Sequence, residues 1–169
     1  MANIEATRIH PGLWQGSRPP FGFTLARAGF NMVVLCAEEF QPPHVMPAGF
    51  DTLLRGMAPF PDVEVVYAPN DDSFSTPPSR EQLKIAITAA QQVTDVVKAG
   101  GKVLVTCWQG KNRSGLVSAL ALHKLLGISG FQAIHRVRAR RRRALSNPHF
   151  VEALMRIDAS PGGLGSPPV

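Results

Sequence analysis

A short polar loop between two apolar stretches constrains the fold of this chain more than any other feature. Residues 102–106 (KVLVT) have the apolar, β-branched character of a buried strand, and residues 116–122 (LVSALAL) have the character of a buried helix. The loop from Cys107 to Gly115 joins them, so the strand must run directly into the helix. Together with the apolar run 32–36, this alternation predicts an α/β fold with a central, mainly parallel sheet of four to five strands flanked by helices.

The remaining sequence divides into further elements and one irregular segment. Residues 8–17 are expected to form a short strand pair or an extended entry segment, followed by a short helix in 21–29 and strands in 31–36 and 63–67. A helix should begin within 77–81 and continue to Lys98, and another should start near Phe131. A last helix should start at Asn147 and pack through Phe150, Leu154 and Ile157. Residues 38–62 are rich in proline and glycine and are expected to be irregular. We therefore predict one domain over residues 1–158, followed by a flexible Gly/Pro-rich tail over 159–169.

The loop itself combines a nucleophile, a cation and a helix N-terminus. Backbone N–H groups and the helix dipole favour an anion at this point, and the same field favours the thiolate form of Cys107. The planar guanidinium of Arg113 can hold two phosphate oxygens, and Gly110 and Gly115 let the chain curl closely around a ligand. Ser114 places a hydroxyl where it can stabilise a departing thiolate. These residues suggest attack of sulfur on phosphorus, through a cysteinyl-phosphate that is then hydrolysed.

The loop resembles the signature loop of the cysteine-dependent protein tyrosine phosphatase superfamily, written H-C-x-x-G-x-x-R-[ST], and the chain is most similar to its small dual-specificity members. Cys107, Gly110, Arg113 and Ser114 match the pattern, while Thr106 stands where the family has a histidine that orders the loop and tunes the thiolate. The resemblance covers about residues 7–158 and implies a phosphatase fold. It implies that the substrate phosphate is bound by the loop residues Trp108, Gln109, Gly110, Lys111, Asn112 and Arg113.

The leaving oxygen of a phosphate ester needs a proton donor. A turn-rich loop follows the strand 63–67, and a loop at the carboxyl end of a strand can overhang the catalytic loop of a neighbouring strand. In the resembling family, the acid is an aspartate about thirty to forty residues before the cysteine, often in a Pro-x-x-Asp pattern. Counting from Pro69, that pattern favours Asp72, which lies 35 positions before Cys107 (107 − 72), and leaves Asp71 as the alternative.

Charge and cysteine content bear on partners and compartment. The net charge of +6 favours anionic partners, and much of it comes from the cluster Arg136, Arg138, Arg140, Arg141, Arg142 and Arg143. A solvated helix face with some arginines paired internally explains this cluster better than nucleic-acid or acidic-lipid binding, because no aromatic residues are interleaved. Two cysteines make no disulfide framework, so we expect a reducing, cytoplasmic setting; Cys36 is expected in the core, and a regulatory disulfide with Cys107 stays open.

These features predict a monomeric phosphomonoester hydrolase that acts on phosphorylated proteins with dual specificity. We expect no metal and no cofactor, because arginine and backbone amides supply the positive field and no metal-ligand spacing is present. Lys111 keeps phosphoinositides, inositol phosphates and an RNA 5′-phosphate open as substrates. Two further alternatives are a catalytically weak phosphate-binding module, which Thr106 favours, and transfer of sulfur or arsenate at a similar anion loop.

Overall fold

The computed structural model describes residues 4–40 and 60–157. The strands are β1 (Ala6–His10), β2 (Leu13–Gly16), β3 (Met32–Ala37), β4 (Glu64–Asn70) and β5 (Val103–Thr106). The helices are α1 (Thr24–Arg27), the 3-10 helix η1 (Glu38–Phe40), α2 (Arg80–Lys98), α3 (Arg113–Leu126), α4 (Gly130–Arg140) and α5 (Pro148–Arg156).

The strands form one sheet in the order β1–β2–β5–β3–β4. The strand β1 pairs antiparallel with β2, and the other three pairings are parallel. Thr106, at the end of β5, is in register with Gly16 of β2 on one side and with Leu35 of β3 on the other. The predicted α/β fold with a mainly parallel sheet of four to five strands is thus confirmed.

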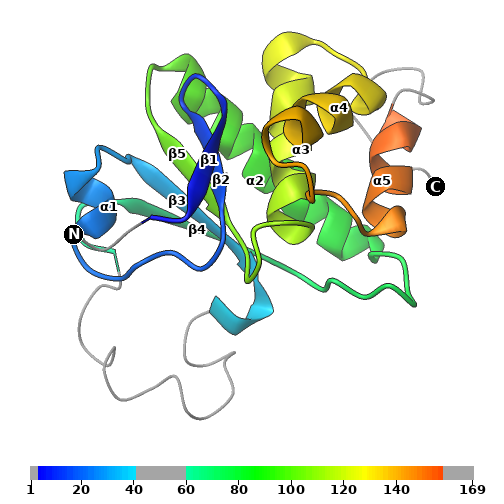
Figure 1. Ribbon diagram of the computed structural model, residues 1–169, viewed down its shortest axis with the longest axis horizontal. Coiled ribbons are helices and arrows are strands. Elements are labelled where there is room, and N and C mark those ends of the chain that lie inside the picture. Colours follow the sequence, from blue (N-terminus) through cyan, green and yellow to red (C-terminus); the bar gives the residue numbers. More distant parts are fainter. Residues whose placement is uncertain (1–3, 41–59, 158–169) are drawn as a thin grey trace.

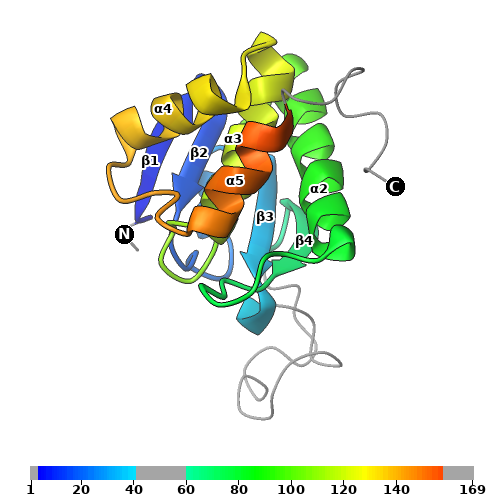
Figure 2. The ribbon, with the colours of Figure 1, turned by 90° about the vertical axis from the view of Figure 1, so that its right-hand side faces the viewer.

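The helices α2, α3, α4 and α5 cover one face of the sheet (Figures 1 and 2), and α1 lies on the opposite side (Figure 1). Every residue of β3 and β5 is buried, which explains why both strands read as continuous apolar runs in the sequence. Along α3, residues 114–122 are all buried, so this helix passes through the core between the sheet and its neighbouring helices.

Side-chain caps explain where the helices begin. Ser79 and Gln82 form a capping box at the start of α2, and Ser129 and Gln132 form another at the start of α4. Asn147 caps α5 by accepting a hydrogen bond from the backbone N–H of His149. Of the three residues expected to pack α5, Phe150 and Leu154 are buried, and Ile157 is partly buried.

The parallel strands bring three chain segments to one edge of the sheet. The signature loop, residues 107–113, follows β5 directly, and η1 follows β3. The segment after β4, residues 71–76, is called the acid loop below. Because β3, β4 and β5 run in the same direction, these segments meet at their carboxyl ends, which lie at the lower edge in Figure 2.

Some expectations fall outside the described residues. The predicted tail, residues 159–169, lies outside them, as does most of the irregular stretch 38–62. No single helix in the described part of the chain is long and apolar enough to cross a membrane. By length and composition alone, α3 and α4 together pass this test, with a bend of 119° between them.

Candidate active site

A pocket of about 260 Å³ opens where the signature loop and the acid loop meet. Its lining residues come from both loops and from the turn before α5: Asp72, Phe74, Cys107, Trp108, Gln109, Lys111, Asn112, Arg113 and Ser146. The structure thus brings the predicted nucleophile, arginine and acid to one cavity. Of the predicted loop residues, only Gly110 and Ser114 are not part of the lining, and both are buried.

Cys107 lies at the inner end of the pocket, immediately after β5. It is 2% exposed, and its backbone N–H donates to the carbonyl oxygen of Gly16 at 3.4 Å. The Sγ atom of Cys107 and the Oγ atom of Ser114 are 3.2 Å apart. Ser114 is fully buried in the first turn of α3, so its hydroxyl stands beside the sulfur as expected from the sequence.

Arg113 is the first residue of α3, and its side chain is held on one side only. Its Nη1 atom donates to a carboxylate oxygen of Glu39 in η1 at 3.0 Å and to the carbonyl oxygen of Asn70 at 3.5 Å. Its Nε atom is buried and has no hydrogen-bond partner among the described residues. A buried guanidinium N–H without a partner, on a residue that lines the pocket, suits an oxyanion ligand.

Asp72 is held over the signature loop by two side-chain amides. One carboxylate oxygen accepts a hydrogen bond from Nδ2 of Asn112 at 3.1 Å, and the other accepts one from Nδ2 of Asn147 at 2.9 Å. Asn147 also donates to the backbone carbonyl oxygen of Ser73 at 3.0 Å, which ties the acid loop to the start of α5. Asp71 is exposed and does not line the pocket, so the position of Asp72 suits proton transfer better.

The orientation of both amides follows from their other partners. The side-chain oxygen of Asn112 accepts from the hydroxyl of Ser146 at 3.1 Å and from the backbone N–H of Asn147 at 3.0 Å. The side-chain oxygen of Asn147 accepts from the backbone N–H of His149. Because each oxygen already faces a donor, each NH₂ group must face Asp72. The carboxylate is therefore surrounded by donors, one on each oxygen.

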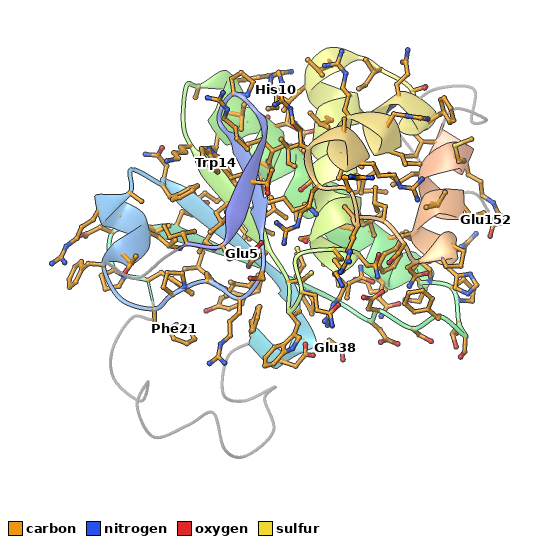
Figure 3. All side chains as sticks on the ribbon, viewed as in Figure 1. Glu5, His10, Trp14, Phe21, Glu38 and Glu152 are labelled. Carbon is orange, nitrogen blue, oxygen red and sulfur yellow. The ribbon has the colours of Figure 1, made fainter. Side chains whose placement is uncertain are left out.

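Arg141 fixes the outer side of the signature loop. Its guanidinium donates to the carbonyl oxygens of Gly110 and Gln109 and forms an ion pair with Glu5, at 2.9 Å. Glu5 lies just before β1 (Figure 3), and the hydrogen bond from Arg141 lowers its pKa from 4.5 to about 2. Arg138 donates to the carbonyl oxygens of Ala144 and Leu145. Two arginines of the basic cluster are thus paired internally.

Gly110 is required by the shape of the loop. Its φ angle is +63°, in the left-handed region that favours glycine. A Cβ atom at this position would lie 2.5 Å from the carbonyl carbon of Gly16 and 2.6 Å from Nη2 of Arg141. The signature loop therefore packs directly against the end of β2.

Thr106 does not contact the signature loop through its hydroxyl. Its Oγ1 atom donates to the carbonyl oxygen of Val34 in β3 at 3.0 Å, within the buried sheet. From the sequence, Thr106 replaces the histidine of the resembling family and favours the alternative of a catalytically weak phosphate-binding module, which stays a prediction. In the structure, a different residue, Gln15, reaches the loop: its Nε2 atom donates to the carbonyl oxygen of Gly110 at 3.0 Å.

Two exposed aromatic side chains flank the mouth of the pocket. Trp108 is 46% exposed and packs against Phe40 of η1, with ring centroids 6.0 Å apart. The guanidinium of Arg18 lies 5.6 Å from the centre of the Trp108 ring. On the acid loop, Phe74 is 57% exposed, and its carbonyl oxygen lies 3.2 Å from Nε2 of His149. Trp108 and Phe74 thus give the pocket apolar surface from both loops.

The second cysteine is part of the core. Cys36 is fully buried in β3, and burial raises the pKa of its thiol well above the ordinary value. The charge of Cys107 raises the pKa of Cys36 further, and that of Arg113 opposes the increase. Leu35 pairs with Thr106, and the two cysteines each follow one residue later, Cys36 within β3 and Cys107 just after β5. Both thiols are free.

Sequence reasoning missed four residues that shape the site. Each acts across a long stretch of chain: Gln15, Glu39, Arg141 and Asn147. The sequence showed Asn147 only as a helix cap and Arg141 only as one of a basic cluster. Gln15 was the one of these four that the sequence could have revealed. It is a polar residue within strand β2, and an interior strand of a sheet with covered faces is expected to be apolar.

No family model matches the chain. Dual specificity protein phosphatase 1B of Arabidopsis thaliana is 34% identical over 68 residues, which are 40% of this chain and 41% of that protein. The chain therefore spans less than half the length of this curated relative. Among solved structures, human DUSP28 superposes with a TM-score of 0.68 at 22% identity, covering 94% of this chain and 98% of the other. The active form of Tk-PTP gives 0.66 at 26% identity, covering 92% and 97%.

The first likeness extends through part of the sequence, and the other two extend through almost the whole fold. In the signature loop, Cys107, Gly110, Arg113 and Ser114 match the pattern of the resembling family. In its fold and in the residues of this loop, the chain is similar to small cysteine phosphatases of the dual-specificity-like type.

Proposed function

We propose that this protein hydrolyses phosphate monoesters through a cysteinyl-phosphate intermediate. The observation that carries the proposal is that Cys107, Arg113 and Asp72, from different parts of the chain, line one small pocket. A nucleophile, a fixed cation and a proton donor around one phosphate-sized cavity are the three groups that this reaction needs.

In the first step, the Cys107 thiolate attacks phosphorus, and the bond from phosphorus to the leaving oxygen breaks. Arg113 and the N–H groups of the signature loop stabilise the charge on the other phosphate oxygens. The buried Nε atom of Arg113, which has no partner among the described residues, supplies one of these donors. Protonated Asp72 gives its proton to the leaving oxygen, so the product leaves as a neutral alcohol or phenol.

In the second step, water attacks the phosphorus of the cysteinyl-phosphate while the Asp72 carboxylate takes its proton. The phosphorus–sulfur bond breaks, inorganic phosphate forms, and the thiolate is regenerated. The hydroxyl of Ser114, 3.2 Å from the sulfur, donates a hydrogen bond to the thiolate as it leaves. Its burial with Cys107 shields this hydrogen bond from water.

We propose a phosphorylated protein side chain as the substrate. Trp108 and Phe74 offer apolar surface on two sides of the mouth, which suits the ring of phosphotyrosine. Both rings are about half exposed and leave the mouth open, so that phosphoserine and phosphothreonine can also reach the sulfur. Lys111 in the lining attracts the dianionic phosphate.

The proposal is tested by release of phosphate from an aryl phosphate in the presence of a metal chelator. The native chain is compared with Cys107→Ser and Asp72→Asn. We expect no turnover from the serine variant. The asparagine variant should lose far more activity on phenyl phosphate than on an ester with a very good leaving group. Activity that survives in Cys107→Ser would refute the thiolate mechanism.

Two other outcomes would redirect the proposal. A native chain that binds phosphate without turnover would be a phosphate-binding module. Faster turnover of phosphoinositides or of an RNA 5′-phosphate than of phosphopeptides would change the substrate class but keep the mechanism.

We further propose that the protein acts as a monomer. We also propose that it acts in the cytoplasm, because a thiolate nucleophile needs a reducing compartment. Light scattering and fractionation of cells test these two points.

A further inference from the structure

We propose that Gln15 is a positioning residue that holds the signature loop in its anion-binding shape. The inference rests on the proposed anion site but concerns how that site is built. Gln15 lies in β2, outside the signature loop, and is fully buried. It lies 95 positions before Gly110, so its effect on the loop depends entirely on the fold.

The side-chain amide of Gln15 faces two consecutive carbonyl groups of the loop. Its Nε2 atom lies 3.0 Å from the carbonyl oxygen of Gly110 and 3.5 Å from that of Lys111. Because both neighbours are acceptors, the amide must present its NH₂ group to them. Its oxygen, Oε1, is then left buried with no hydrogen-bond partner in the described structure.

A buried amide oxygen without a partner opposes folding by about 1–3 kcal/mol. A leucine or methionine of similar size would pack in this strand without that cost, because the surrounding core is apolar. Gln15 therefore makes the protein less stable than leucine or methionine would at this position. Such an unsatisfied buried group calls for an explanation outside stability, and the two loop carbonyls supply it.

The geometry of the peptide bond explains what the contact does. In a trans peptide, the C=O of one residue and the N–H of the next point in opposite directions. Holding the carbonyls of Gly110 and Lys111 outward, toward Gln15, turns the N–H groups of Lys111 and Asn112 the other way. Lys111 and Asn112 both line the pocket, so their N–H groups are directed at a bound oxyanion.

Neighbouring residues make room for this contact, and each of the two carbonyls has one further donor. Gly115, in the first turn of α3, has no side chain, and a Cβ atom there would already lie 3.5 Å from Nε2 of Gln15. The hydroxyl of Thr106, one residue before the nucleophile, is bound to Val34 in β3. Arg141 also donates to the Gly110 carbonyl from the outer side, and the backbone N–H of Leu145 donates to the Lys111 carbonyl at 3.1 Å. Gln15 differs from both of these donors because its one amide reaches both carbonyls from within the sheet.

The test measures oxyanion binding apart from turnover. In a Cys107→Ser background, calorimetry gives the dissociation constants for inorganic phosphate and tungstate, and thermal unfolding gives the melting temperature. Gln15→Leu should weaken oxyanion binding about tenfold, because the loop carbonyls lose a donor. Its melting temperature should equal or exceed that of the parent. Gln15→Glu should weaken binding further, because it turns a carboxylate toward two carbonyl oxygens.

Ser118→Ala is a matched control. Ser118 is also fully buried, its hydroxyl likewise has no partner among the described residues, and it lies in α3 away from the signature loop. This variant should keep the parent affinity. If the role of Gln15 is only structural, Gln15→Leu would instead lower the melting temperature and leave oxyanion binding unchanged.

The outcomes separate this inference from the proposed function. If Gln15→Leu, or Gln15→Met should the first variant not fold, binds phosphate within about twofold of the parent, the positioning role is refuted. If the parent binds phosphate tightly but the native chain turns over no ester, the hydrolase proposal fails and the positioning role stands. A parent that binds no oxyanion at all would overturn both.

Discussion

Replacing Asn147 with serine should selectively damage proton donation by Asp72. Asn147 donates to the carboxylate of Asp72 at 2.9 Å and to the carbonyl oxygen of Ser73 at 3.0 Å. Serine is about as good a helix cap as asparagine, so it can still accept from the N–H of His149 and preserve the start of α5. Its shorter side chain, however, cannot reach the acid loop.

The expected magnitude follows from the bonds that are lost and kept. A hydrogen bond to a charged group contributes about 2 kcal/mol, which corresponds to roughly a thirtyfold change in rate if it were lost entirely from the transition state. The bond from Asn112 to the other carboxylate oxygen remains, at 3.1 Å. We therefore expect kcat/KM to fall about tenfold for phenyl phosphate, whose leaving oxygen needs the proton.

An ester with a very good leaving group provides the comparison. For a dinitrophenyl phosphate, the leaving oxygen needs little protonation, so kcat/KM of Asn147→Ser should stay within about twofold of the native value. Ser129→Ala serves as a control, because it removes the capping box of α4 and so lowers stability without touching the pocket. Equal losses on both esters would show that Asn147 does not act through Asp72, and no loss on either would show that its two bonds to the acid loop are dispensable.

Three further predictions test other parts of the site. Because its folded pKa is about 2, ionised Glu5 stabilises the native state above pH 4.5, and this contribution disappears as the pH falls toward 2. The carboxylate is largely exposed and screened, so Glu5→Gln should lower the unfolding free energy at pH 7 by less than about 1 kcal/mol, with a smaller difference at pH 3. Gly110→Ala should destabilise the chain by about 1–3 kcal/mol and abolish measurable phosphate binding, since its Cβ would meet the Gly16 backbone. Iodoacetamide at neutral pH should add one group, at Cys107, which mass spectrometry of peptides would detect. Cys36 should not react, because it is fully buried and its raised pKa keeps it protonated. Labelling of Cys36 in the native protein would contradict its placement in the core.

The parts of the fold that the sequence predicted are those that local chemistry determines. The buried strands β3 and β5 read as apolar runs because both of their faces are covered. The start of α2 was predicted from proline and serine at 77–79, and Ser79 forms its cap. The signature loop was recognisable because its residues are adjacent in the chain and because their chemistry suits one proposed reaction.

The choice between Asp71 and Asp72 needed the structure. Both follow the same strand and differ by one position, so the spacing before Cys107 suits either. What separates them is contact with Asn112 and Asn147, which are 40 and 75 positions away from Asp72. No local pattern contains that information, because the amide that a carboxylate meets depends on how α5 packs beside the acid loop.

Glu39 illustrates the same limit for the arginine. In the sequence it stands in a segment expected to be irregular, with nothing to connect it to Arg113, which is 74 positions away. In the structure, η1 follows β3 at the edge where the signature loop begins, so the carboxylate holds one end of the guanidinium. The parallel order of β3 and β5 makes this pairing possible.

Thr106 shows why a departure from a motif has to be considered together with the elements that surround the motif. A missing histidine beside the nucleophile argues for a weakly ordered loop if the loop depends on that residue. The carbonyl groups of the signature loop are instead held from β2 by Gln15 and from the end of α4 by Arg141. Because Gln15 and Arg141 both donate to the carbonyl of Gly110, removing one of these side chains should disturb the loop less than removing both. The order of an anion-binding loop is therefore a property of the surrounding elements, and an atypical residue within the motif is weak ground for expecting a loop that cannot bind its anion.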